Sequence, residues 1–96
     1  MGTTYTSLRY HLVFSTRDRR RQIHPAWRLL LHEYLGGTVR GLEGVAHMVG
    51  GVEDHVHLLV GLKPTHRLAD FVRELKKASS VWASVNHNTD FAWQAG

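Results

Sequence analysis

The sequence predicts an α+β domain with the element order β-α-β-β-α-β, the split βαβ arrangement of ferredoxin-like folds. Two segments with apolar residues at helical spacing alternate with short segments rich in β-branched and aromatic residues. The chain has 96 residues, which suits a single domain with a modest core. We therefore expect residues 1–96 to form one domain, an antiparallel sheet with two helices on one face.

Composition narrows the classes of partner and compartment. Twelve Lys and Arg against eight Asp and Glu give a net charge of +4, which favours a polyanionic partner. The chain has no cysteine, which excludes disulfides and thiolate metal sites. The first residues are polar, and no apolar run approaches the ~18 residues of a membrane span, so a cytoplasmic protein is expected.

The first strand is predicted over residues 8–16, which are rich in aromatic and β-branched side chains. Directly after it stand four arginines, Arg17, Arg19, Arg20 and Arg21, with one aspartate between them. Such a cluster is either a solvated loop or a contact to phosphate, whose oxygens match the guanidinium fork. We favour a nucleic-acid contact.

The first helix is predicted from Pro25, which suits a first helical turn because its missing N–H needs no partner there. Apolar residues keep helical spacing over residues 27–35. The pattern either ends at the glycine pair at 36–37 or continues to Gly41. We expect His32 at the surface of this helix.

Two further strands are predicted over residues 45–49 and 55–62. Residues 50–54 join them and contain two glycines and two acidic residues, which suit a chain reversal. The run 58–62 is almost continuously apolar, as expected of a central strand, and Pro64 follows its end.

The second helix is predicted to begin at Thr65 or His66 and to carry an apolar stripe as far as Trp82. Its other face bears a surplus of positive charge: Arg67, Arg73, Lys76 and Lys77 against Asp70 and Glu74. This face is either simply solvated or a second surface that follows a phosphate backbone. Residues 91–94 alternate and are predicted as the last strand.

His55 and His57 stand two residues apart at the start of the third predicted strand. Successive side chains of a strand point to opposite faces, so both imidazoles share one face, with Cα atoms ~6.5–7 Å apart. Neutral imidazoles at this spacing can bind one cation. On the pair alone, a metal clamp and two solvated histidines both stay open.

Four blocks in this order resemble one protein family over essentially the whole chain. They are residues 10–17 (YHLVFSTR), 50–62 (GGVEDHVHLLVGL), 75–82 (LKKASSVW) and 91–96 (FAWQAG). The chain resembles the HUH single-tyrosine transposases of small bacterial insertion sequences, and especially their relatives associated with repetitive extragenic palindromes (REP).

The resemblance implies cleavage and rejoining of single-stranded DNA, often in a hairpin, through a 5′-phosphotyrosine. It also implies that His55 and His57 bind a divalent cation, Mg or Mn, with Zn possible because imidazole prefers later transition metals. Arg17, Arg19, Arg20, Arg21, Arg73, Lys76 and Lys77 are then predicted to contact DNA. A homodimer is expected.

The resemblance has one departure that concerns the nucleophile. In the family, the catalytic tyrosine lies on a helix that follows the last block, beyond the position of Gly96. None of Tyr5, Tyr10 and Tyr34 matches it, so the catalytic residue stays unknown and a transposase core deficient in cleavage is expected. The alternative is a non-catalytic dimeric module that binds DNA hairpins and competes with an intact transposase. A stable fold without a present function is a third interpretation.

Overall fold

The computed structural model describes residues 8–95. Its elements are β1 (Leu8–Ser15), the short 3-10 helix η1 (Arg17–Arg19), α1 (Arg28–Gly41), β2 (Val45–Gly51), β3 (His55–Leu62) and α2 (Leu68–Asn86). This order confirms the predicted α+β class with an antiparallel sheet and two helices. Within the described range, no helix is long and apolar enough to cross a membrane.

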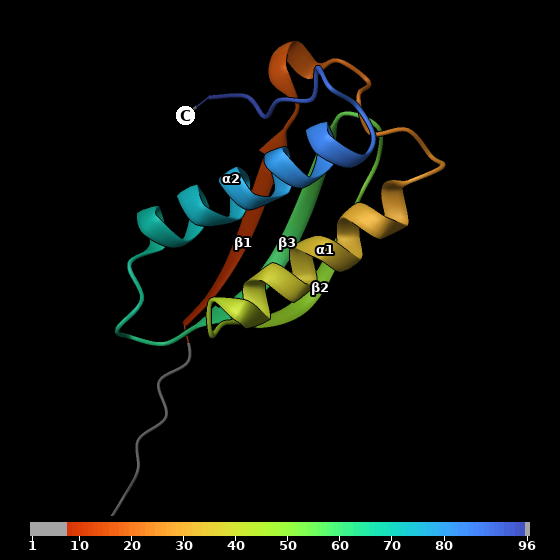
Figure 1. The fold of residues 1–96 in the computed structure, drawn as a ribbon. Helices are drawn as coiled ribbons and strands as arrows, with labels where there is room; N and C mark the ends of the chain where they lie inside the picture. The colour runs from red at the N-terminus through yellow and green to blue at the C-terminus, as the bar shows by residue number, and fades with distance from the viewer. Residues whose placement is uncertain (1–7, 96) are drawn as a thin grey trace, which may run out of the picture.

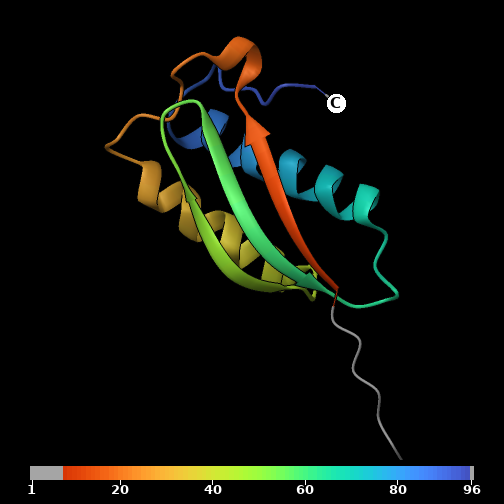
Figure 2. The same cartoon turned by 180° about the vertical axis from the view of Figure 1, so that it is seen from behind.

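The sheet has the order β1-β3-β2, and both pairs are antiparallel. Both helices pack on one face of it (Figure 1), while residues 8–95 leave the other face uncovered (Figure 2). Ser15 pairs with His55 at one end of the β1–β3 ladder, and Leu8 pairs with Leu62 at the other. The central position of β3 between two partners fixes its side chains more firmly than an edge strand would.

The core lies between the sheet and the helices and follows the alternation of the strands. β3 contributes Val56, Leu58 and Val60, all fully buried, and the helices contribute residues at helical spacing. The remaining buried apolar side chains are Leu12, Phe14, Ile23, Trp27, Leu31, Leu35, Val39, Leu62, Phe71, Leu75, Ala83, Phe91 and Trp93. This one-sided burial leaves the opposite face of the same strands available for polar groups.

The start of α1 differs from the sequence expectation, and its end agrees with one of the two alternatives left open. Pro25 lies in a turn, where Trp27 N–H binds the carbonyl of His24, and α1 begins at Arg28. The glycine pair at 36–37 does not end the helix, which continues to Gly41 because the neighbouring Leu35 and Val39 are buried. Tertiary packing thus outweighs the low helix propensity of glycine.

The predicted last strand at 91–94 is reduced to a single bridge between Trp93 and Thr16. The segment crosses the end of β1, where Arg17 N–H binds the carbonyl of Ala92 and Gln94 N–H binds that of Ser15. The Trp93 side chain is buried and donates its indole N–H to Ser79 Oγ at 2.9 Å. Two backbone hydrogen bonds and the packing of Trp93 therefore hold this segment, with no extended ladder among the described residues.

Candidate metal and nucleic-acid site

The two histidines of the predicted clamp lie side by side on the uncovered face of the sheet. His55 pairs with Ser15, and His57 pairs with Val13 on β1 and with Gly50 on β2. Both side chains are half-buried, and their ring centroids are 6.3 Å apart. The strand alternation that predicted a shared face is therefore confirmed, and both rings lie within reach of one small ligand.

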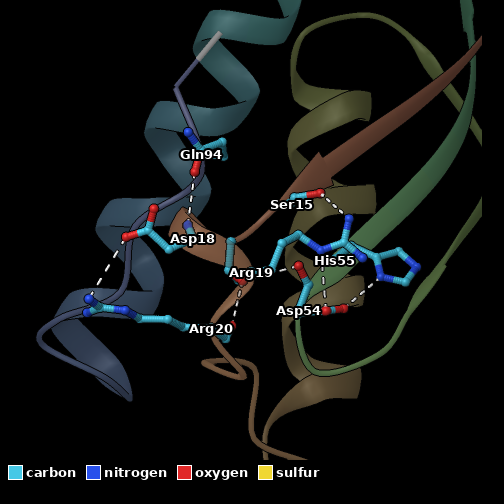
Figure 3. Close-up of polar contacts among 8 residues, drawn as sticks. Ser15, Asp18, Arg19, Arg20, Asp54, His55 and Gln94 are labelled. Carbon is cyan, nitrogen blue, oxygen red and sulfur yellow. Dashed lines mark hydrogen bonds and ion pairs between the residues drawn. The ribbon is translucent and has the colours of Figure 1, made fainter.

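Asp54 orients the first of these histidines. One carboxylate oxygen lies 2.9 Å from His55 Nδ1, and the other accepts a hydrogen bond from Arg19 Nε at 3.3 Å (Figure 3). The hydrogen bond with His55 and the positive charge of Arg19 lower the pKa of Asp54. A carboxylate at Nδ1 favours the tautomer that carries its proton there, and this leaves Nε2 as the free lone pair.

The role of Asp54 was missed in the sequence interpretation. An acidic residue directly before the His-x-His pair was the available signal, but sequence spacing alone does not tell which ring nitrogen it meets. One more histidine borders the clamp, since the ring of His11 stands edge-on to His57 at 5.8 Å, whereas His47 lies farther along the sheet, beside Gly61 of β3. Within residues 8–95, no group of three His, Asp or Glu is arranged to hold a metal.

The arginine cluster forms an exposed turn at the same end of the sheet as His55. Asp18 and Arg19 adopt left-handed backbone angles, with φ of 56° and 55°. Thr16 lies buried under the turn, where its hydroxyl donates to the carbonyl of Arg20 at 2.5 Å. All four arginines are exposed, but Arg19 pairs with Asp54 at 3.3 Å and Arg20 pairs with Asp18 at 3.9 Å.

Residues 92–94 connect this turn to α2. The Gln94 side-chain carbonyl accepts the Asp18 N–H at 2.9 Å, and the Gln94 backbone carbonyl accepts from Lys76 Nζ at 2.9 Å. Lys76 Nζ also lies 5.6 Å from the centre of the Phe14 ring. The structure therefore brings Lys76 next to the arginine turn, a proximity that the sequence did not specify.

The other two predicted cations of α2 are exposed. Arg73 pairs with Asp70 one helical turn earlier, at 3.1 Å, which reduces the charge that it offers to a partner. Lys77 is exposed on the helix. The seven residues predicted to contact DNA thus form two groups. Lys76 and the four arginines lie together at the turn, whereas Arg73 and Lys77 lie on α2, where the ion pair of Arg73 reduces its available charge.

Neither described tyrosine lies on the face that carries the histidines. Tyr10 packs against the core on the helix side of β1, and the ring of Tyr34 on α1 stacks on Trp82 at 5.0 Å. Tyr5 lies outside the described residues. The catalytic residue therefore stays unassigned among the described tyrosines.

Comparison with known proteins places the chain in a family. The family model of IS200-like transposases matches residues 4–96. A crystal structure of a Deinococcus radiodurans R1 protein assigned as a transposase is similar with a TM-score of 0.86 and 27% identity, over 100% of this chain and 80% of that chain. A REP-associated tyrosine transposase bound to a REP hairpin is similar with a TM-score of 0.68 and 16% identity, over 100% of this chain and 57% of that chain. No curated protein matches significantly.

The family model covers nearly the whole sequence, and its span includes all four blocks that carried the resemblance. The fold, an antiparallel sheet with two helices on one face, is the one shared with the solved structures. The chain therefore belongs to the IS200-like transposase family.

Proposed function

We propose that this chain binds single-stranded or hairpin DNA together with a divalent cation, as the DNA- and metal-holding part of a transposase site. The observation that carries the proposal is the group Arg19–Asp54–His55 beside His57, on a sheet face that no other part of the described chain covers. It joins an oriented imidazole pair to a turn rich in arginine.

His55 and His57 would hold the cation, Mg, Mn or Zn, through their ring nitrogens. Two imidazoles fit an ion that takes its other ligands from water and phosphate oxygens. When bound, such an ion supplies positive charge to the phosphate that is cleaved. Asp54 acts as a positioning residue, because its carboxylate fixes the His55 ring and directs Nε2 away from itself.

The arginine turn would hold the DNA backbone. Arg17, Arg20 and Arg21 are exposed, and Lys76 reaches the same region through Gln94. Phosphate contacts of this type position a strand without reading its sequence. Arg19, Arg73 and Lys77 complete the proposed set. Ion pairs reduce the charge that Arg19, Arg20 and Arg73 offer to DNA, least for Arg20, whose distance to Asp18 is 3.9 Å.

The cation site is tested by titrating Mn²⁺ into the wild-type chain and into a His55→Ala, His57→Ala variant. We expect measurable binding by the first and none by the second. Asp54→Ala should lose about 10- to 100-fold in affinity, as orienting carboxylates of metal-bound histidines typically do. The same affinity in all three proteins would refute the assignment of the ligands.

DNA binding is tested by the salt dependence of affinity for a single strand and for a hairpin. Each lost phosphate contact lowers the log–log slope by about 0.7 on a single strand. The Arg20→Ala, Arg21→Ala variant should therefore lose about twice that value. Lys63→Ala is the matched control, because Lys63 follows β3 at the far end of the sheet and pairs with Glu43. An unchanged slope in the double arginine variant would contradict the proposed contact.

Both candidate assignments exclude covalent attachment to DNA, so one experiment tests them together. A transposase core deficient in cleavage, or a non-catalytic binding module, forms no protein–DNA adduct, in keeping with the positions of Tyr10 and Tyr34. Incubation with single-stranded DNA and Mn²⁺, followed by mass spectrometry, checks this. An adduct on Tyr5, Tyr10 or Tyr34 would show that the chain contains its own nucleophile.

We also propose a homodimer, as the family resemblance implies. β2 is an edge strand, and its Val45 and Met48 are 54% and 52% exposed, so it has both free backbone groups and apolar side chains for a second copy. Light scattering after size exclusion should give twice the monomer mass of 10.9 kDa, and a monomeric mass would contradict the proposal.

A further inference from the structure

Gly50 occupies the position on β2 directly opposite His57. On the other side of His57, β1 presents Val13, and the ring of His11 lies edge-on at 5.8 Å. The His57 imidazole therefore stands between a strand that carries side chains and a residue that carries none. Figure 2 shows this face with β3 between the two other strands.

The missing side chain matters because of what it would touch. A Cβ atom at position 50 would lie 3.3 Å from His57 Cε1 and 3.4 Å from His57 Nε2. These two atoms form the edge of the ring that a ligand at Nε2 must approach. We propose that Gly50 is a positioning residue, which keeps the Nε2 side of His57 open to a bound cation. The inference rests on the proposed function, in which His57 holds that cation.

The neighbouring glycine has a different reason to be there. Gly51 has a φ of 153°, and a Cβ atom on it would lie 2.3 Å from the backbone oxygen of His55. Gly51 is therefore required by the backbone. Gly50 does not have a left-handed φ, and the atoms nearest to a Cβ placed on it belong to the His57 side chain. An alanine at position 50 would require the His57 ring to shift by a few tenths of an ångström, and the backbone could keep its conformation.

Stability alone would favour another residue at position 50. Glycine inside a strand destabilises the fold relative to alanine, and β-branched residues suit strands better still. A valine at this position would suit the pleated surface but would cover the ring edge of His57. Folding alone would favour a side chain at this position. A glycine is expected here if a ligand needs room to approach His57.

The test compares Gly50→Ala and Gly50→Val with two matched controls. Gly61→Ala also puts a methyl group against a histidine ring on the same face, 3.0 Å from His47 Nε2, but that histidine is outside the proposed clamp. Gly41→Ala meets nothing within 4 Å. Thermal unfolding should leave both Gly50 variants as stable as the wild type, within a few degrees.

Two readouts then examine the site itself. Mn²⁺ affinity should fall several-fold in Gly50→Ala and more than tenfold in Gly50→Val, and stay within twofold in both controls. Without metal, diethyl pyrocarbonate, which acylates accessible neutral imidazoles, should modify His57 more slowly in Gly50→Val while the rate at His55 is unchanged. Peptide mass spectrometry resolves the two histidines.

These outcomes separate the inference from the proposed function. If the wild-type chain binds no Mn²⁺, the proposed function is refuted. The acylation rates of wild type and Gly50→Val without metal still decide whether the absence of a side chain at position 50 keeps His57 accessible. An unchanged His57 rate in Gly50→Val overturns the inference. Loss of the fold in Gly50→Val overturns it too, because the inference requires a backbone that accepts a side chain here.

Discussion

The side chains of β3 alternate between two faces. Those that point towards the helices are fully buried: Val56, Leu58 and Val60. Those on the opposite face are half-buried: His55, His57 and Leu59. The same contrast holds on β1, where Leu12 and Phe14 are buried and Val13 is 60% exposed. One strand thus supplies two environments, one dry and apolar, the other open and lined with imidazoles.

The difference assigns separate physical roles to the two faces. Burial of apolar area drives folding, and it lies almost entirely on the helix side. The open face contributes little to that free energy, so it can carry polar groups, a glycine and an oriented carboxylate at small cost. Substitutions on the two faces should therefore affect different measurements, and each prediction below tests that separation.

Leu58→Ala should give the largest effect. Its side chain is fully buried in the middle of the central strand, so truncation removes contacts and leaves a cavity, at a cost of about 2–5 kcal/mol. Chemical denaturation measures this. Leu59→Ala is the matched control on the open face and should cost clearly less. Equal losses in both variants would mean that the open face is covered in solution, for example by a second copy of the chain.

Ser79→Ala should have the second largest effect on the helix side. The Ser79 hydroxyl donates to the carbonyl of Leu75 at 2.7 Å and accepts the indole N–H of Trp93 at 2.9 Å. Removing it leaves a buried donor without a partner, which costs about 1–3 kcal/mol. Unfolding curves measure the loss, and Trp fluorescence reports on the environment of the indoles.

Ser80→Ala is the control for this substitution, since its hydroxyl binds only the carbonyl of Lys77 within the same helix. A Ser79→Ala variant as stable as Ser80→Ala would show that residues 92–94 are not held through Trp93. The position of Gln94 between the arginine turn and Lys76 would then need another cause.

The periodicity of the sequence predicted the fold well because burial on one face leaves a clear pattern. The alternation around His57 and the helical spacing from Trp27 to Leu35 each place residues on a face without knowledge of the rest of the chain. The segment 91–94 alternates too, but a buried indole that binds Ser79 on α2 decides its path. No local pattern reveals such a distant contact.

The candidate site was only partly predictable for the same reason. The shared face of His55 and His57 follows from spacing, but the Arg19–Asp54–His55 chain joins residues 35 positions apart. It is accompanied by left-handed angles at Asp18 and Arg19; aspartate adopts such angles more often than most residues, but arginine does not. His32, expected at the surface, is partly buried, and its Nε2 atom has no partner among the described residues.

His57→Ala should leave stability almost unchanged, within about 0.5 kcal/mol, because the half-buried ring contributes little apolar burial. The same variant should lose the proposed Mn²⁺ binding, so one substitution separates the two roles of β3. Denaturation and titration on the same sample measure both. A loss of stability comparable to that of Leu58→Ala would break the comparison between the faces.

The smallest effect is expected from His32, a histidine on α1 rather than on the open face. Burial, followed by the charge of Arg28, lowers the pKa of His32 below its ordinary value of 6.5. As the pH falls, His32 is therefore protonated in the unfolded chain before it is protonated in the folded chain. The stability that His32 contributes is present above pH 6.5 and is lost as the pH falls through that value towards the lowered pKa of the folded state.

His32→Gln removes this titration while it keeps a neutral polar side chain. The free energy of unfolding, measured between pH 8 and pH 5, should decline less in His32→Gln than in the wild type, so the difference between the two proteins should change across this range. Parallel curves for wild type and His32→Gln would mean that His32 is as solvated in the folded chain as in the unfolded one, and that α1 lies less closely on the edge of the sheet.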